Sequence, residues 1–210
     1  MKKIIIIISF LLLGRILAVE KKTSWAGYPF ASYSNETKLV LGAFFIYEYA
    51  DSASYKFQLL NNSLFSINKQ YMTIIMPQFT KNDESTIIDL TIKARKWPSS
   101  FYGIGNNTLE DDEEKYVPIQ YEAELEYKQK VAEHLYLSGI AQIIDTRMTH
   151  LDSEGELAKK TIPGSEKNML TGVGAAVTLD KRDDKNYSTS GYYLSFRSVK
   201  FTDALGSDYN

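Results

Sequence analysis

The sequence contains no cysteine, and this absence excludes three kinds of chemistry at once. Without thiols there is no disulfide scaffold, no thiolate metal site and no cysteine nucleophile. Histidine is scarce, with two residues in 210. Neither sign of charge is in surplus, because 24 Lys and Arg face 26 Asp and Glu, for a formal net charge of -2. A nucleic-acid-binding protein would carry a basic surplus, so nucleic acid is not an expected partner.

Tyrosine, in contrast, is abundant. The chain has 15 Tyr, 10 Phe and 2 Trp, and aromatic residues make up 13% of it. Tyr and Phe favour β-strands and membrane interfaces. Hydrophobic residues reach 44%, which excludes a disordered, highly charged tail. The composition therefore predicts an ordered, strand-rich protein.

The N-terminus has the three-part plan of a secretory signal peptide. A basic start is followed by the apolar run Ile4 to Leu13, broken only by Ser9, and the small residue Ala18 precedes Val19. The run is too short to span a bilayer, which takes about 20 apolar residues. A short anchor helix or a buried strand is the alternative. We expect an exported protein that is cleaved after Ala18.

The stretch from Ile119 to Val131 alternates with a period of two residues. Apart from Gln129, its odd positions are apolar, whereas its even positions carry one Gln, three Glu and two Lys. On a helix these apolar residues would scatter around the whole circumference. The pattern therefore predicts a strand with one apolar and one charged face.

The same pattern, more or less clean, predicts nine strands, many of them longer than ten residues. Such lengths exceed the usual five to six residues of soluble proteins and suit strands that cross a bilayer at a tilt. Tight turns alternate with longer connections, of which the polar segments 97–117 and 149–167 are the longest. Both of these segments therefore lie at the same end of the predicted sheet, which we take as the outer side of the membrane. The predicted strands are 27–34, 38–50, 54–67, 69–80, 85–96, 118–131, 134–148, 168–181 and 189–202.

These features together predict an all-β fold, namely a transmembrane antiparallel up-and-down β-barrel preceded by a signal peptide. Membrane barrels combine short periplasmic turns with long outer loops, and they place apolar residues toward lipid and polar residues toward the lumen. A sandwich with its charges in solvent would show the same alternation. A soluble exported β-sandwich or lipocalin-like binding or adhesion module therefore stays open. The expected organisation is a signal peptide at 1–18, a short N-terminal segment at 19–26 and the barrel domain at 27–210, incomplete at its C-terminus.

Several segments resemble the BamA/TamA family of outer-membrane barrels, also called the bacterial surface antigen family. They span nearly the whole mature chain in family order. The matching segments are Pro29-Phe30-Ala31-Ser32-Tyr33-Ser34-Asn35-Glu36-Thr37, Phe101-Tyr102-Gly103-Ile104-Gly105-Asn106, Ile162-Pro163-Gly164-Ser165, Asp180-Lys181-Arg182-Asp183-Asp184, Ser190-Gly191-Tyr192-Tyr193 and Asp203-Ala204-Leu205-Gly206-Ser207-Asp208-Tyr209.

The resemblance implies a sixteen-stranded barrel in the Gram-negative outer membrane, of which this chain holds about nine strands from the N-terminal part. The partners that it implies are outer-membrane lipids, lipopolysaccharide and the barrel-assembly machinery. It also implies a link to outer-membrane assembly or polypeptide translocation, but it does not identify a cargo. Only about eight residues separate Val19 from the first strand, too few for the periplasmic repeats of the insertases. Fold and location are therefore carried over from the family, and the insertase role is not.

The residues offer little for catalysis, and we expect a non-enzyme without cofactor or metal. His134 and His150 lie at the two ends of one predicted strand, about 50 Å apart at about 3.3 Å per residue, so they cannot share a metal. Gly164-Ser165 is interpreted as a turn rather than a nucleophile elbow. The acidic run 110–114 lacks the spacing of a calcium-binding loop and is interpreted as a solvated outer loop.

Charged residues within the strands suggest an internal network instead. One face of the predicted strand 118–131 carries Glu122, Glu124 and Glu126. Like charges in a row repel one another, so nearby cations are needed to compensate them. Lys93 and Arg95 on the preceding strand are the predicted partners. The last predicted connection holds Arg182, Asp183 and Asp184, interpreted as a structural periplasmic turn, and Gly191 is expected to supply a tight backbone bend. A solvated lumen wall is the simpler alternative to a bracing network.

Overall fold

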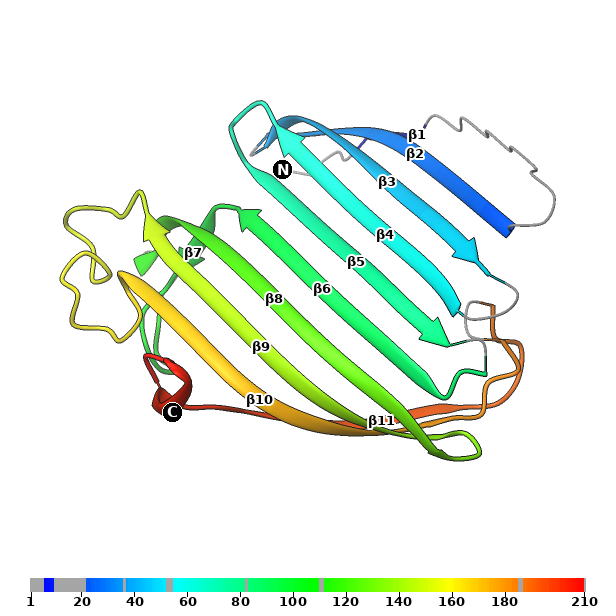
Figure 1. Cartoon of the computed structure of the whole chain (residues 1–210). Helices are drawn as coiled ribbons and strands as arrows, with labels where there is room; N and C mark the ends of the chain where they lie inside the picture. The colour runs from blue at the N-terminus through cyan, green and yellow to red at the C-terminus, as the bar shows by residue number, and fades with distance from the viewer. Residues whose placement is uncertain are drawn as a thin grey trace.

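The structure is a computed structural model that describes residues 6–9, 22–35, 37–51, 55–81, 83–109, 112–184 and 187–209. These residues form one open antiparallel sheet in which neighbours in sequence are neighbours in space (Figure 1). The short strand β7 lies off this path and pairs with β8. The strands are β1 (Ile6–Ser9), β2 (Lys22–Ser34), β3 (Lys38–Ala50), β4 (Tyr55–Ser66), β5 (Tyr71–Lys81), β6 (Thr86–Lys96), β7 (Ser99–Phe101), β8 (Glu114–Ala132), β9 (Leu135–Thr149), β10 (Lys167–Asp180) and β11 (Tyr193–Phe201).

The prediction of an all-β, antiparallel, up-and-down arrangement is confirmed, and each of the nine predicted strands is present. Three boundaries differ substantially: β2 begins at Lys22 rather than at residue 27, β8 at Glu114 rather than at 118, and β11 at Tyr193 rather than at 189. The expected signal peptide at 1–18 falls outside the described residues except for 6–9, so it stays a prediction. In the part of the chain that the structure describes, no helix is long and apolar enough to cross a bilayer.

The long connections lie at one end of the sheet, as predicted. Residues 102–113 and 150–166 share the end at which β6 and β9 finish, which we call the long-loop end (Figure 1). Part of the predicted 97–117 loop is strand, because Ser99–Phe101 pairs with Glu114–Tyr116 and extends β8. The opposite, short-turn end carries a third connection, between Asp180 and Tyr193, which is longer than the predicted turn 182–188.

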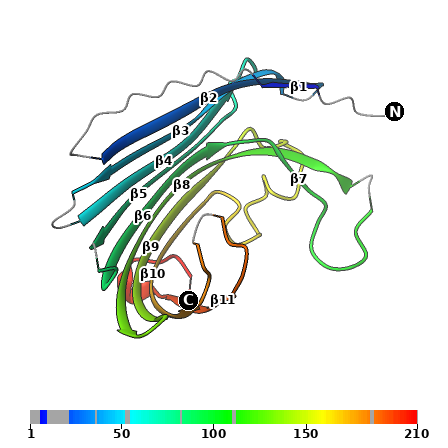
Figure 2. The same ribbon diagram turned by 90° about the vertical axis from the view of Figure 1, so that its right-hand side faces the viewer.

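The sheet curves into a trough whose concave side is the inner side (Figure 2). The last strand, β11, approaches β10 closely, and two glycines of β10 permit this approach. A Cβ on Gly172 would lie 2.8 Å from the Lys200 carbonyl oxygen, and one on Gly174 would collide with that of Ser198. Side chains at these positions would push β11 away, so glycine lets the last strand fold inward across β10.

Candidate functional site: the charged concave face

The two faces of β8 differ sharply in exposure and in chemistry. The side chains of Glu122, Glu124 and Glu126 are 15%, 15% and 13% exposed. Leu125 and Tyr127, between and beside them, are 46% and 47% exposed. The predicted alternation is therefore confirmed, and the charged face is the sheltered one. The apolar residues of this strand project from the convex side.

Glu122 is held by two neighbouring strands. Lys93 on β6 forms an ion pair with it at 3.0 Å, and the Nε2 of Gln142 on β9 donates to the same carboxylate at 3.2 Å. Lys93 was a predicted partner of this row, and that prediction is confirmed. The prediction for Arg95 is wrong, because the register places Arg95 opposite Gln120, beyond the glutamates.

The cation that pairs with Glu124 lies on a strand that is not adjacent to β8 and was not predicted as its partner. Arg197 lies on β11, and β9 and β10 separate this strand from β8. Its guanidinium nevertheless pairs with Glu124 and lies 3.9 Å from Glu126. Ala176 and Ser138, which lie in register with Arg197, are small and buried, which leaves room for a long side chain on this side of the sheet. Arg197 thus spans the inside of the trough and ties its last strand to its middle.

A second group of charges continues the network toward the short-turn end. Lys128 forms an ion pair with Asp89 on β6 at 2.7 Å and lies 3.7 Å from Glu126. The Nε2 of Gln78 on β5 donates to Asp89 at 2.6 Å. Further along the concave side, Glu48 accepts from the Ser24 hydroxyl at 3.0 Å and from the Gln58 amide at 2.8 Å. A band of paired polar groups therefore runs across strands β2 to β11.

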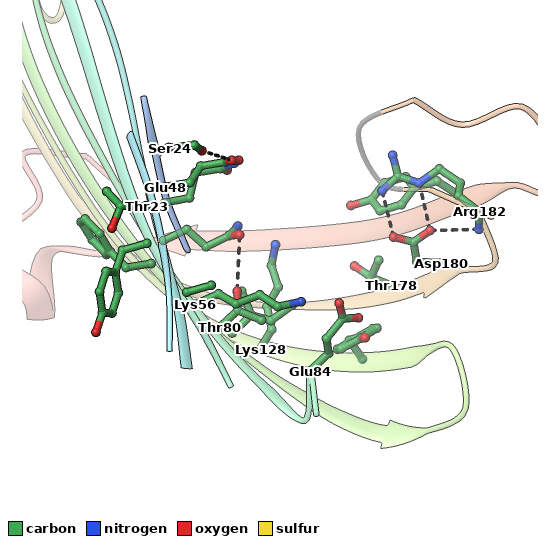
Figure 3. A pocket seen from close by; sticks show the side chains of 18 residues that line it. Thr23, Ser24, Glu48, Lys56, Thr80, Glu84, Lys128, Thr178, Asp180 and Arg182 are labelled. Carbon is green, nitrogen blue, oxygen red and sulfur yellow. Dashed lines mark hydrogen bonds and ion pairs between the residues drawn. The ribbon is translucent and has the colours of Figure 1, made fainter. Parts of the chain in front are cut away.

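A hollow of roughly 810 Å³ lies along this band at the short-turn end of the trough (Figure 3). Its wall mixes cations and anions, including Lys56, Glu84 and Lys128. Thr80 and Thr178 contribute nearly buried hydroxyls. Such a wall suits water and ions better than an apolar ligand, because buried charges need polar partners.

The connection from β10 to β11 closes this end of the hollow. Arg182 donates from Nε and Nη2 to the two carboxylate oxygens of Asp180 at 2.9 and 2.8 Å, and its guanidinium lies 4.8 Å from the centre of the Tyr193 ring. The ion pair with Asp180 raises the pKa of Arg182. Gly191 has a φ of 96°, and a Cβ there would collide with the Lys181 carbonyl, so the predicted glycine bend is confirmed.

Asp183 organises the same loop. Its carboxylate accepts hydrogen bonds from the backbone N–H groups of Asp184, Thr189 and Ser190 and from the hydroxyls of Ser188 and Thr189. These bonds, led by that from the Thr189 hydroxyl, hold the pKa of Asp183 well below its usual range. The structural role predicted for Arg182 and Asp183 is therefore confirmed, and the turn is a loop of twelve residues, 181–192.

The two histidines lie apart, as predicted, in the residues flanking the ends of β9. His134 adopts a φ of 63° in the turn before the strand, and its Nδ1 lies 3.1 Å from the Asp180 carbonyl. His150 follows the strand with a φ of 54°, and its Nδ1 lies 3.2 Å from the Thr149 hydroxyl. Ser165 donates its N–H to the Ile162 carbonyl at 3.1 Å, which confirms the predicted turn at Gly164-Ser165.

The acidic run lies partly outside the described residues, at 110 and 111. Glu114 fixes the neighbouring loop, because its carboxylate accepts the N–H groups of Glu156 and Leu157 at 2.6 and 3.1 Å. The Ser100 hydroxyl donates to Glu113 at 2.6 Å, which lowers the pKa of Glu113. Among the described residues, no cluster of three or more His, Asp or Glu side chains could hold a metal ion.

Comparison with known proteins finds no matching family model, no matching curated protein and no matching solved structure.

Proposed function

We propose that this chain forms part of the wall of an integral outer-membrane β-barrel of the BamA/TamA, or bacterial surface antigen, type. One observation carries the proposal: on β6, β8 and β11 the paired charged side chains lie on the concave face, and large apolar side chains lie on the convex face. A soluble curved sheet buries its apolar face inside and turns its charges to solvent. A membrane barrel does the reverse, because lipid surrounds it and water fills it.

The convex face of six strands supports this proposal. Large apolar side chains on β3, β6, β8, β9, β10 and β11 are exposed there, far beyond the isolated apolar residues of an ordinary soluble surface. Exposed examples are Leu41, Ile92, Leu125, Ile143, Val173, Val177, Leu194 and Phe196.

Aromatic residues gather near both ends of this face. Toward the short-turn end the register aligns Tyr49, Phe57, Phe79, Ile88 and Tyr127, and the Phe57 and Phe79 rings lie 4.8 Å apart. Toward the long-loop end, Phe65 and Tyr71 face each other with ring centres 6.3 Å apart. Phe57 and Phe65 are eight residues apart, roughly 26 Å along the strand. Aromatic girdles flank an apolar band of about 25 Å in outer-membrane barrels.

The alternative is a soluble exported module that binds a ligand, as lipocalins do. The roughly 810 Å³ hollow favours it, since ligand pockets commonly measure 300–1,000 Å³. Such pockets are lined mainly by apolar and aromatic side chains, whereas this one mixes Lys56, Glu84 and Lys128. The exposed convex face would also be left without a role. A barrel therefore accounts for both the charged concave face and the apolar convex face, whereas a soluble module accounts only for the concave face.

The finer part of the proposal follows the sequence resemblance. On that basis the protein is a non-enzyme, its partners are outer-membrane lipids, lipopolysaccharide and the barrel-assembly machinery, and its role belongs to outer-membrane assembly or polypeptide translocation.

Membrane fractionation tests the proposal. Expressed in a Gram-negative host, the chain should stay in the outer-membrane pellet after a carbonate wash and leave it only in detergent. Release by carbonate would instead identify a soluble module. Replacing Leu125 by Arg should reduce the pelleted fraction, whereas replacing the neighbouring Glu124 by Gln should leave it close to wild type.

A further inference from the structure

A row of basic residues crosses the convex face at the long-loop end. The register aligns Lys96 on β6 with Ile119 on β8, Ile119 with Arg147 on β9, and Arg147 with Lys167 on β10. The alternation of side chains places these residues on the convex face, together with the exposed Ile92, Tyr121 and Ile143. We call the exposed apolar side chains of this face the apolar band. Three cations therefore share one row at the border of a largely apolar region.

Two of these cations are direct cross-strand neighbours. Arg147 and Lys167 oppose each other in adjacent strands, where Cβ atoms are about 5 Å apart and like charges destabilise the pair. One carboxylate relieves this in part, because Asp145 accepts from Nε and Nη2 of Arg147 at 3.2 and 3.0 Å. Glu166, next to Lys167 in sequence, is paired with Lys160. Within the described part of the chain, Lys96 and Lys167 have no ion-pair partner, and the Arg147 side chain is 65% exposed.

The surroundings of the row identify its ligand. On one side lie polar loops, and on the other lie Ile92, Tyr121 and Ile143 of the exposed apolar band. The Tyr71 and Tyr121 hydroxyls lie 3.5 Å apart at this border. A ligand that meets both regions has anionic groups directly attached to apolar chains. Clustered Lys and Arg at a membrane border attract anionic headgroups, and guanidinium groups bind phosphate in a bidentate manner.

We propose that Lys96, Arg147 and Lys167 form a binding site for the phosphorylated headgroup of a lipid, with the acyl chains lying along the apolar band beside Tyr121. The site rests on the proposed function, because it needs the convex face to meet lipid. It assigns the long-loop end to the leaflet that holds the phosphorylated lipid. In an outer membrane this is the outer leaflet, and the ligand is a phosphorylated glycolipid.

The test uses the full chain folded in a neutral detergent, with diphosphoryl lipid A as the probe and its dephosphorylated form as the comparison. Native mass spectrometry counts bound lipid across a titration. We expect the wild-type chain to bind the phosphorylated form, and the double substitution Arg147→Gln and Lys167→Gln to weaken binding roughly tenfold or more through loss of two charge-assisted contacts. The matched control, Lys81→Gln with Lys181→Gln, removes two cations at the short-turn end and should bind as wild type does.

Three outcomes would overturn the site: equal binding of both lipid forms, equal weakening by the control pair, or full competition by millimolar inorganic phosphate, which would indicate a phosphate site without a lipid. Circular dichroism of each variant confirms that it folds, and Lys96→Gln alone provides a milder second variant expected to weaken binding severalfold.

Insertion into vesicles of neutral phosphatidylcholine separates the two proposals. A chain that inserts there but ignores lipid A phosphates refutes only this site, whereas a chain that fails to insert refutes the barrel.

Discussion

At the scale of single residues, the face of β8 on which a side chain lies determines how its substitution affects stability. Leu125 projects from the convex face and Glu124 from the concave face, where it pairs with Arg197. We expect Leu125→Arg to lower the free energy of unfolding from lipid vesicles by about 2–4 kcal/mol, because it places a charge in the hydrocarbon layer. Glu124→Gln should cost about 1 kcal/mol, since the amide keeps the shape and faces water. Urea titration followed by tryptophan fluorescence measures both, and equal effects would contradict the assignment of faces.

The Arg197–Glu124 pair gives a second prediction at this scale. Its partners come from β11 and β8, so it should couple the curl of the last strand to the middle of the sheet. A double-mutant cycle with Arg197→Gln and Glu124→Gln should give a coupling energy of about 1–2 kcal/mol, within the usual range for contacting charges that are partly exposed. The same cycle with Lys93→Gln in place of Arg197→Gln should give a coupling near zero, because Lys93 pairs with Glu122. Additive effects of Arg197 and Glu124 would mean that the pair does not brace the sheet.

These two positions also mark how far sequence reasoning reaches among side chains. Alternation places Glu124 and Leu125 on opposite faces, because strand geometry fixes that relation locally. The pairing of Lys93 with Glu122 follows from strand order and register in neighbouring strands. Arg197 reaches Glu124 across two intervening strands, and this depends on the curl that Gly172 and Gly174 permit. Curvature of that kind comes from packing of the whole sheet, and no local pattern encodes it.

At the scale of elements, the Asp183 carboxylate joins the two sides of the connection between β10 and β11. Asp183 accepts the Thr189 hydroxyl and three backbone N–H groups, and these bonds, led by that from the hydroxyl, lower its pKa. The pKa of the Asp183 carboxyl is lower in the folded than in the unfolded protein, so the ionised carboxylate stabilises the loop. This stabilisation is present above the unfolded carboxyl pKa of about 3.9 and is lost as the pH falls toward the folded pKa. Hydrogen-exchange protection of the Thr189 and Ser190 amides should therefore be high at pH 7 and fall at acidic pH.

The variant Asp183→Asn serves as the control for this pH effect. It should have lower protection of both amides at pH 7 and no acid-dependent loss between pH 7 and pH 3. Protection factors corrected for intrinsic exchange rates give the comparison. If the wild-type protection does not change with pH, the Asp183 carboxylate is not what orders the loop.

The same loop explains the main error in predicting the elements. Residues Ser190 to Tyr193 lead directly into an alternating stretch, so the sequence suggests a strand from 189. In the structure, Thr189 and Ser190 donate to Asp183, and Gly191 bends back against Lys181, which removes all three from the ladder. Side-chain capture of backbone groups competes with strand pairing, and its outcome depends on a residue six positions away. The strands themselves were predictable because their apolar faces repeat over many residues.

At the scale of the whole molecule, the two long connections at one end predict a sidedness. We expect epitope tags inserted in 102–109 or 152–159 to be reached by antibody on intact cells, because outer-membrane barrels carry their long loops outside. A tag at Asp83, in the turn at the opposite end, should be detected only after the membrane is permeabilised. Accessibility of the Asp83 tag alone on intact cells would show that the topology is inverted.

The openness of the sheet gives another prediction. The described sheet runs from β1 to β11 without pairing of these two strands, so the outer edge of β11 is left with backbone groups that lipid cannot satisfy. We expect the 210-residue chain, refolded in detergent, to pair its open edge with a second copy and to give cross-linked dimers. On a gel it should not run as a compact monomer that shifts on boiling. Such a heat-modifiable monomer would show that this chain closes by itself.

The central claim is that the convex face meets lipid and the concave face meets water. The most direct test places single cysteines at positions 121 to 128 of a chain inserted in lipid vesicles, which is clean because the native chain has none. Spin labels on these cysteines report collisions with oxygen, which concentrates in lipid, and with a water-soluble nickel complex. The account predicts alternation with a period of two, with oxygen favoured at 121, 123, 125 and 127 and nickel favoured at 122, 124, 126 and 128. Reversed alternation, or nickel access at all eight positions, would contradict it.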